Sequence, residues 1–142
     1  MKIAIASDHG GYELKEIIYK YLLEKRYDII DFGTNSTDSC HYPIYANKVC
    51  DAILNNDFER GILICTTGIG MSIMANRHKG IRAAVLSDKF SAEMTRKHNN
   101  SNVLCLGSKI IDENLAKELV DIWLKTDFEA GRHQTRINMF DM

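Results

Sequence analysis

The sequence has 142 residues, of which 45% are hydrophobic and 26% charged, and its formal net charge is -1 at pH 7. These values predict one globular domain over residues 1–142 with a substantial core. Neither the near-neutral charge nor the short apolar runs favour a nucleic-acid or membrane partner. The chain reaches Asp8 too soon for the apolar region of a signal peptide, so we expect a cytoplasmic protein.

Four cysteines, at positions 40, 50, 65 and 105, and five histidines are spread singly along the chain. No two cysteines stand at the two-residue spacing that is typical of zinc or dithiol sites. We therefore expect free thiols, and the scattered histidines do not predict a metal site.

Taken in chain order, short apolar β-branched runs alternate with stretches of helical periodicity. Strands are predicted over residues 3–6, 27–32, 61–64, 81–86 and 102–106. Amphipathic helices are predicted over residues 14–22, 45–53, 90–97 and 115–123, with another helix after Gly70 and a short last one within 131–140. This alternation predicts an α/β fold, a single doubly wound domain whose five-stranded parallel sheet has the order 2-1-3-4-5 and helices on both faces.

This order places a topological switch point between the first and third strands, and ligands bind beyond the carboxyl ends of the strands at such a point. Two loops follow these strands, Ser7–Gly11 and Cys65–Ser72. The first loop carries Asp8 and His9 ahead of two glycines. Asp8 is explained equally well as a functional carboxylate or as the cap of the next helix.

The second loop, Cys-Thr-Thr-Gly-Ile-Gly-Met-Ser, starts with the thiol of Cys65 at the end of an apolar strand. Gly68 and Gly70 allow backbone N–H groups to point at an anion, and the next helix adds the positive end of its dipole. A helix N-terminus also favours the thiolate form of a neighbouring cysteine. A buried structural cysteine is the alternative, but the flanking glycines and hydroxyls favour a functional one.

Two more clusters lie late in the chain. His98, at the end of the fourth predicted helix, can exchange a proton near neutral pH, and the asparagines after it suit a left-handed C-cap. Arg132 and Arg136 share one face of the last helix and suit a phosphate, although an isolated pair is more often a solvated basic surface. On local sequence alone, Tyr42, Lys109, His41, His78 and His133 have no comparable support and are expected at the surface. The whole set favours proton transfer next to a carbonyl in a phosphorylated substrate, which requires no metal or organic cofactor.

Along essentially the whole chain, these motifs resemble those of the ribose-5-phosphate isomerase B family. The same resemblance extends to four further motifs, Asp31-Phe-Gly-Thr34, Tyr42-Pro43, Gly80-Ile-Arg-Ala83 and Gly131-Arg-His133. The resemblance implies a Rossmann-like domain that interconverts ribose 5-phosphate and ribulose 5-phosphate through an enediolate. It also implies a homodimer or a pair of dimers, with active sites built from both subunits and with residues 128–142 at the dimer interface.

The same resemblance implies a role for each site residue. Cys65 is the base that moves a proton between C1 and C2, and His98 is the acid that opens the furanose ring, with Asp8 nearby. Thr67 and the backbone of the loop hold the enediolate oxygens, so that the substrate-binding residues include Thr66, Thr67, Gly68, Ile69 and Gly70. The phosphate is held by His9, Arg132 and Arg136, and the site is also lined by Asn99 and Lys109.

Three positions depart from the usual pattern of that family. This chain has His41 where the family usually has Asp, Thr66 where it usually has Gly, and Lys109 where it usually has Arg. The sequence His41-Tyr-Pro-Ile44 is instead similar to the B subunit of galactose-6-phosphate isomerase, so a hexose 6-phosphate such as allose or galactose 6-phosphate remains an alternative substrate. A more distant alternative is a non-catalytic nucleotide- or flavin-binding module, for which Asp88 would supply the acidic ribose partner.

Overall fold

A parallel five-stranded sheet forms the centre of the molecule, in a computed structural model that describes residues 1–142. Its strands are β1 (Lys2–Ser7), β2 (Asp28–Asp31), β3 (Arg60–Cys65), β4 (Ala83–Val85) and β5 (Val103–Gly107). The helices are η1 (His9–Gly11), α1 (Tyr12–Glu24), α2 (Tyr42–Leu54), α3 (Ile69–Ala75), α4 (Lys89–Asn99), α5 (Glu113–Lys125) and α6 (Arg132–Ile137). Every predicted element is present, and none of the helices has the length and hydrophobicity that crossing a bilayer requires.

The order of the strands is β2-β1-β3-β5-β4, which confirms the α/β class but corrects the order 2-1-3-4-5 expected from the sequence. β5 takes the position beside β3 because all of its residues are buried, whereas the three residues of β4 are partly or fully exposed. A short, half-exposed strand suits the edge of a sheet and a fully apolar one suits its centre. The switch point between β1 and β3 is unaffected.

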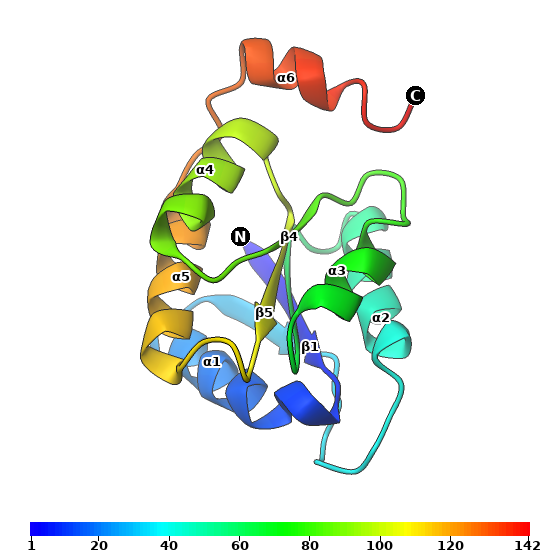
Figure 1. The fold of residues 1–142 in the computed structure, drawn as a ribbon, viewed down its shortest axis with the longest axis vertical. Helices are drawn as coiled ribbons and strands as arrows, with labels where there is room; N and C mark the ends of the chain where they lie inside the picture. Colours follow the sequence, from blue (N-terminus) through cyan, green and yellow to red (C-terminus); the bar gives the residue numbers. More distant parts are fainter.

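The helices cover the sheet in two layers (Figure 1). α1, α4 and α5 lie on one face and enclose a core that includes Trp123, while α2 and α3 cover the other face around Met71 and Cys105. The amphipathic periodicity of the helices determines this arrangement, because each helix turns its apolar stripe toward the β-branched residues of the strands.

Local signals fix where several helices start and end. Pro43 lies in the first turn of α2, where its missing N–H has no helical partner to lose. The side chain of Asp112 caps α5 by accepting a hydrogen bond of 2.8 Å from the N–H of Leu115. Asn100 ends α4 in the left-handed conformation, so the C-cap expected in the His98-Asn99-Asn100 stretch is confirmed.

A buried lysine ties α1 to the end of β2. The Lys15 side chain is fully buried, and its Nζ donates hydrogen bonds of 2.6 Å to Asp31 and 2.7 Å to Glu16. The other oxygen of Asp31 accepts the N–H of Gly33 at 2.8 Å. Because the carbonyl of Gly33 accepts the N–H of Ser7 at 2.8 Å, this ion pair supports the start of the first functional loop.

We expect Asp31→Asn to lower the free energy of unfolding by about 3 kcal/mol, because it leaves the buried Lys15 ammonium with only the half-exposed Glu16 as a charged partner. The matched control is Glu16→Gln, since the half-exposed Glu16 is expected to contribute less than about 1 kcal/mol. Urea unfolding of both variants measures the difference. Equal losses in the two variants would contradict a special role for the Lys15–Asp31 pair.

Candidate active site

Three loops meet at the carboxyl ends of β1, β3 and β5, where the switch point was predicted. The backbone N–H of Asp8 donates to the carbonyl of Ile64 at 3.2 Å, and the N–H of Ser108 donates to the carbonyl of Cys65 at 2.9 Å. The hydroxyl of Ser108 also donates to the carbonyl of Gly10 at 2.7 Å. A Cβ atom at Gly10 would collide with the hydroxyl of Thr66, so glycine is required for this approach.

Cys65 is the last residue of β3, and its side chain is at the entrance of the glycine-rich loop. Only 6% of the residue is exposed, and its Sγ accepts a hydrogen bond of 3.1 Å from the N–H of Gly68. Gly68 has a φ of +81°, a conformation that glycine adopts without strain and that turns this N–H back toward the sulfur. The loop therefore directs a backbone donor at the sulfur.

The rest of the loop offers further donors to an anion. The side-chain oxygen of Thr67 accepts the N–H of Ile69 at 3.2 Å, which leaves the Thr67 hydroxyl proton free to point outward. Gly70 and Met71 lie in the first turn of α3, where N–H groups have no partner within the helix. Thr66, Thr67 and Ile69 are exposed, so the loop is open to a ligand.

Asp8 and His9 face this loop from β1. Oδ1 of Asp8 caps the turn η1 by accepting the N–H of Gly11 at 3.0 Å, and Oδ2 has no hydrogen bond from the protein. Both sequence interpretations of Asp8 are therefore compatible with its geometry. Nδ1 of His9 accepts the N–H of Cys40 at 3.2 Å, so the proton of the neutral ring lies on Nε2 and is available to an anion.

The structure adds Tyr42 and Ser108 to the surroundings of the site, and it places Lys109 beside them. The ring of Tyr42 covers Gly70 so closely that a Cβ atom there would lie 2.8 Å from the ring. The N–H of Lys109 donates to the carbonyl of Thr66 at 3.0 Å. Its exposed side chain lines a hollow of about 330 Å³ together with Gly10 and Ser108. No sequence pattern indicated Ser108, because its position depends on a contact with Gly10, 98 residues earlier in the chain.

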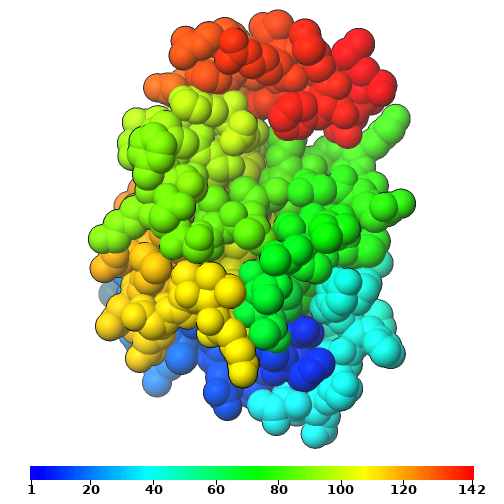
Figure 2. All heavy atoms as spheres, viewed as in Figure 1, coloured from blue at the N-terminus to red at the C-terminus, as the bar shows by residue number.

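The other expected site residues lie at the opposite end of the molecule. His98 and Asn99 end α4, just before the amino end of β5, whereas Cys65 lies level with Gly107 at its carboxyl end. The four residues of strand between these levels span about 13 Å. Figure 1 shows α6, with Arg132 and Arg136, beyond the end of α4, and Figure 2 shows the C-terminal segment as a separate ridge across this end. One chain therefore does not bring the two groups together.

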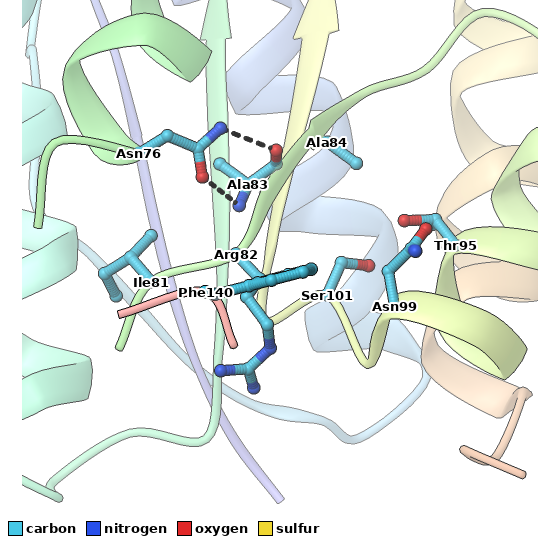
Figure 3. Close-up of a pocket in the computed structure, with 9 residues that line it drawn as sticks. All are labelled: Asn76, Ile81, Arg82, Ala83, Ala84, Thr95, Asn99, Ser101 and Phe140. Atoms are coloured by element: carbon cyan, nitrogen blue, oxygen red, sulfur yellow. Dashed lines mark hydrogen bonds between the residues drawn. The ribbon is translucent and has the colours of Figure 1, made fainter. Parts of the chain in front are cut away.

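Asn99 lines a pocket of about 250 Å³ at this second end (Figure 3). Arg82 lies across the pocket and donates to the carbonyl of Asn100 at 2.9 Å, and Phe140 of the C-terminal segment lies beside it. Asn76 forms two hydrogen bonds with the backbone of Ala83, at 2.8 and 2.9 Å, which attach the end of α3 to β4. The pocket is thus lined by residues from the end of α3, from the edge strand β4 and from the C-terminal segment.

His133 is buried, which corrects its expected place at the surface. Its ring stacks on that of His98 with a centroid distance of 4.4 Å and an interplanar angle of 16°. The burial lowers the pKa of His133, and the neighbouring His98 and Arg132 lower it further. The signal that could have revealed this pair is the four-residue spacing of His133 and Ile137, which places both on the face of α6 that is turned inward.

Asp88 has a structural role instead of the ligand contact that a nucleotide module would need. It caps α4 by accepting the N–H of Ser91 at 2.7 Å, and its second oxygen accepts the Ser91 hydroxyl at 2.9 Å. These hydrogen bonds lower the pKa of Asp88 and occupy both of its oxygens. The nucleotide- or flavin-binding alternative therefore loses its acidic residue.

Comparison with known proteins gives a consistent result over the full length of the chain. A family model described as ribose/galactose isomerase matches residues 3–140. Ribose-5-phosphate isomerase B of Escherichia coli is 46% identical over 136 residues, which cover 96% of this chain and 91% of that protein. The structure of a ribose 5-phosphate isomerase from Thermotoga maritima is similar with a TM-score of 0.97 and 50% identity, covering 99% of this chain and 97% of that one. Ribose-5-phosphate isomerase B from Mycoplasma genitalium, solved with bound ribulose-5-phosphate, has a TM-score of 0.92 and 43% identity, covering 96% and 91%.

Proposed function

This chain belongs to the ribose/galactose isomerase family, and we propose that it interconverts ribose 5-phosphate and ribulose 5-phosphate as a dimer with shared active sites. The observation that carries the proposal is the division of the candidate residues between two ends of the chain. The Cys65 loop has a base and anion donors, and the other end has an imidazole and two arginines. Each end has what the other lacks for isomerising a sugar phosphate.

A strip of exposed apolar side chains connects the two ends. Ile69 and Ile73 lie one turn apart on α3 and are 54% and 60% exposed, and Val85 of the edge strand is 43% exposed. At the other end of the strip, Phe140 is 55% exposed and lies beside the pocket at β4. An exposed apolar strip of this kind is typical of a protein–protein interface. In a symmetric dimer whose two-fold axis passes near the middle of the strip, the Phe140 end of one copy packs against the Ile69 end of the other. The C-terminal residues 128–142 of one copy then lie beside the Cys65 loop of the other.

The reaction starts with opening of the furanose ring. The bond between C1 and the ring oxygen breaks, and the ring oxygen takes a proton from His98 of the second copy. The hydroxyl on C1 gives its proton to the free oxygen of Asp8, which leaves an aldehyde at C1. General acid–base catalysis of this kind requires an imidazole that changes protonation state near neutral pH.

Isomerisation of the open chain follows at the Cys65 loop. The thiolate of Cys65 removes the proton from C2, and the electrons move to the carbonyl oxygen to give an enediolate. The hydroxyl of Thr67 and the free N–H groups of α3 stabilise the negative oxygens. The proton of the C2 hydroxyl passes to the oxygen on C1, and the same sulfur returns its proton to C1, which leaves a hydroxyl on C1 and the carbonyl at C2. His9 beside the Cys65 loop, together with Arg132 and Arg136 of the second copy, holds the phosphate and so fixes the sugar relative to the sulfur.

We expect kcat/KM for ribose 5-phosphate to exceed that for allose or galactose 6-phosphate by about a hundredfold. The reason is Thr66, whose side chain fills the space above Gly10 where the family usually has glycine. Measuring both classes of substrate on the same enzyme tests the proposal. A hexose 6-phosphate used at the higher kcat/KM would assign the alternative substrate, and no turnover of either class would contradict the proposed function.

A further inference from the structure

Three side chains from different segments meet beside α6. The rings of His98 and His133 are stacked, and Oε1 of Glu129 lies 3.9 Å from Nε2 of His98 and 3.8 Å from Nε2 of His133. Both distances are too long for hydrogen bonds, yet a small rotation of the half-exposed Glu129 side chain would bring it to either ring. Nε2 of His133 is buried and has no hydrogen-bond partner.

The surroundings of this cluster are rich in positive charge. Arg132 and Arg136 lie on α6 itself, and Lys97 is next to His98 on α4, where it pairs with Glu93 at 2.6 Å. Glu129, in the segment before α6, is the one carboxylate within ion-pair distance of the two imidazoles. A second positive charge on His133 would oppose protonation of its stacked neighbour, and burial holds His133 neutral by lowering its pKa.

A shared metal ion explains this cluster less well than hydrogen bonding does. The three donor atoms lie within 4.8 Å of one another. However, a metal bound by two imidazoles lies in the plane of each ring, and two stacked rings with nearly parallel planes cannot both point at one ion. The stack instead suits a fixed orientation of one ring by the other.

We propose that His133 and Glu129 are positioning residues for His98: the buried ring of His133 fixes the plane of the His98 ring, and Glu129 stabilises its protonated form. The inference rests on the proposed isomerase function and concerns only the ring-opening step. His98 is 42% exposed, so without the stack its ring would be free to rotate. Without Glu129, the neighbouring arginines would oppose the charge that His98 needs as an acid.

The test separates ring opening from proton transfer. Conversion of ribose 5-phosphate requires both steps, whereas exchange of the C1 proton of ribulose 5-phosphate in D2O requires only the enediolate step, since this ketose has no furanose ring to open. For His133→Leu we expect kcat/KM for ribose 5-phosphate to fall about tenfold or more, with C1 exchange within about twofold of the unmodified enzyme. His133→Phe keeps a flat ring in the stack and is expected to keep most of the activity.

Glu129→Gln provides an independent readout at a half-exposed position. Because it removes the one carboxylate within ion-pair distance of the two imidazoles, the alkaline limb of kcat/KM for ribose 5-phosphate should move to lower pH by about half a unit. Glu118→Gln removes an exposed carboxylate of α5 that pairs with Lys89 at 2.7 Å, so it is the charge-matched control and should change neither readout.

Three results would overturn the inference: equal loss of conversion and exchange in His133→Leu, no loss of either, or an unmoved pH limb in Glu129→Gln. Sedimentation of each variant shows whether the dimer is retained. A variant that loses activity because it no longer dimerises has a structural defect, not a positioning defect. If the unmodified enzyme turns over ribose 5-phosphate and the variants match it in conversion, C1 exchange and pH limb, the positioning role is contradicted and the proposed function is not. An unmodified enzyme without turnover would reject the proposed function.

Discussion

Replacing Cys65 by alanine is expected to lower kcat for ribose 5-phosphate by about a thousandfold or more, because the change removes the group that we propose carries the proton between C2 and C1. Cys65→Ser should be nearly as inactive, since a serine hydroxyl is a far weaker base. The fold should be retained, because alanine fits the space at the end of β3 and the lost hydrogen bond from Gly68 lies at the loop entrance. Kinetics and thermal unfolding of the same preparation measure both effects.

The other cysteines provide the control for this experiment. Cys50 lies on the buried face of α2, where burial raises its pKa to about 12, and burial raises the pKa of Cys105 well above its ordinary value. Neither thiol is therefore ionised at neutral pH, and Cys50→Ala should leave kcat within about twofold. Near-normal turnover by Cys65→Ala, or an equal loss in Cys50→Ala, would contradict the assignment of Cys65 as the base.

Much of the fold follows from patterns that are local in the sequence. The alternation of apolar runs and helical periodicity predicted the five strands and the six α-helices but not the short turn η1, and Asp8, Pro43 and Asn100 mark helix boundaries by mechanisms that operate within a few residues. The exchange of the last two strands was missed, because strand order depends on which strand buries both faces. The three-residue β4 could not be distinguished from a central strand by its composition alone.

The site was predictable where it depends on the ends of strands. Parallel strands end at one edge of the sheet, so Asp8 and the Cys65 loop could be placed together from topology. Ser108 and the buried His133 were missed, because their positions depend on contacts between distant segments. No sequence pattern indicates that His98 and Arg132 lie far from Cys65 in the same chain, since this requires the direction of α4 and the position of α6.

The proposed shared site makes activity depend on assembly. Since neither end of the chain holds a complete set of the candidate catalytic and binding groups, loss of the proposed interface is expected to remove activity as well. In that arrangement the apolar strip from Ile69 to Phe140 would set the distance between the sulfur and the imidazole. Substitutions at Ile73 or Val85 are accordingly expected to affect activity through assembly.

Mixing two inactive variants tests the shared site most directly. One chain carries Cys65→Ala, and the other carries His98→Asn with Arg132→Ala, so each lacks one end of the site. Unfolded and refolded together in equal amounts, half of the dimers should contain both chains, and each of these has one native site and one doubly defective site. We predict recovery of about a quarter of the unmodified activity, a gain of at least a hundredfold over either variant alone. Activity that stays at the level of the separate variants, when mass measurement shows that mixed dimers have formed, would contradict an active site built from two copies.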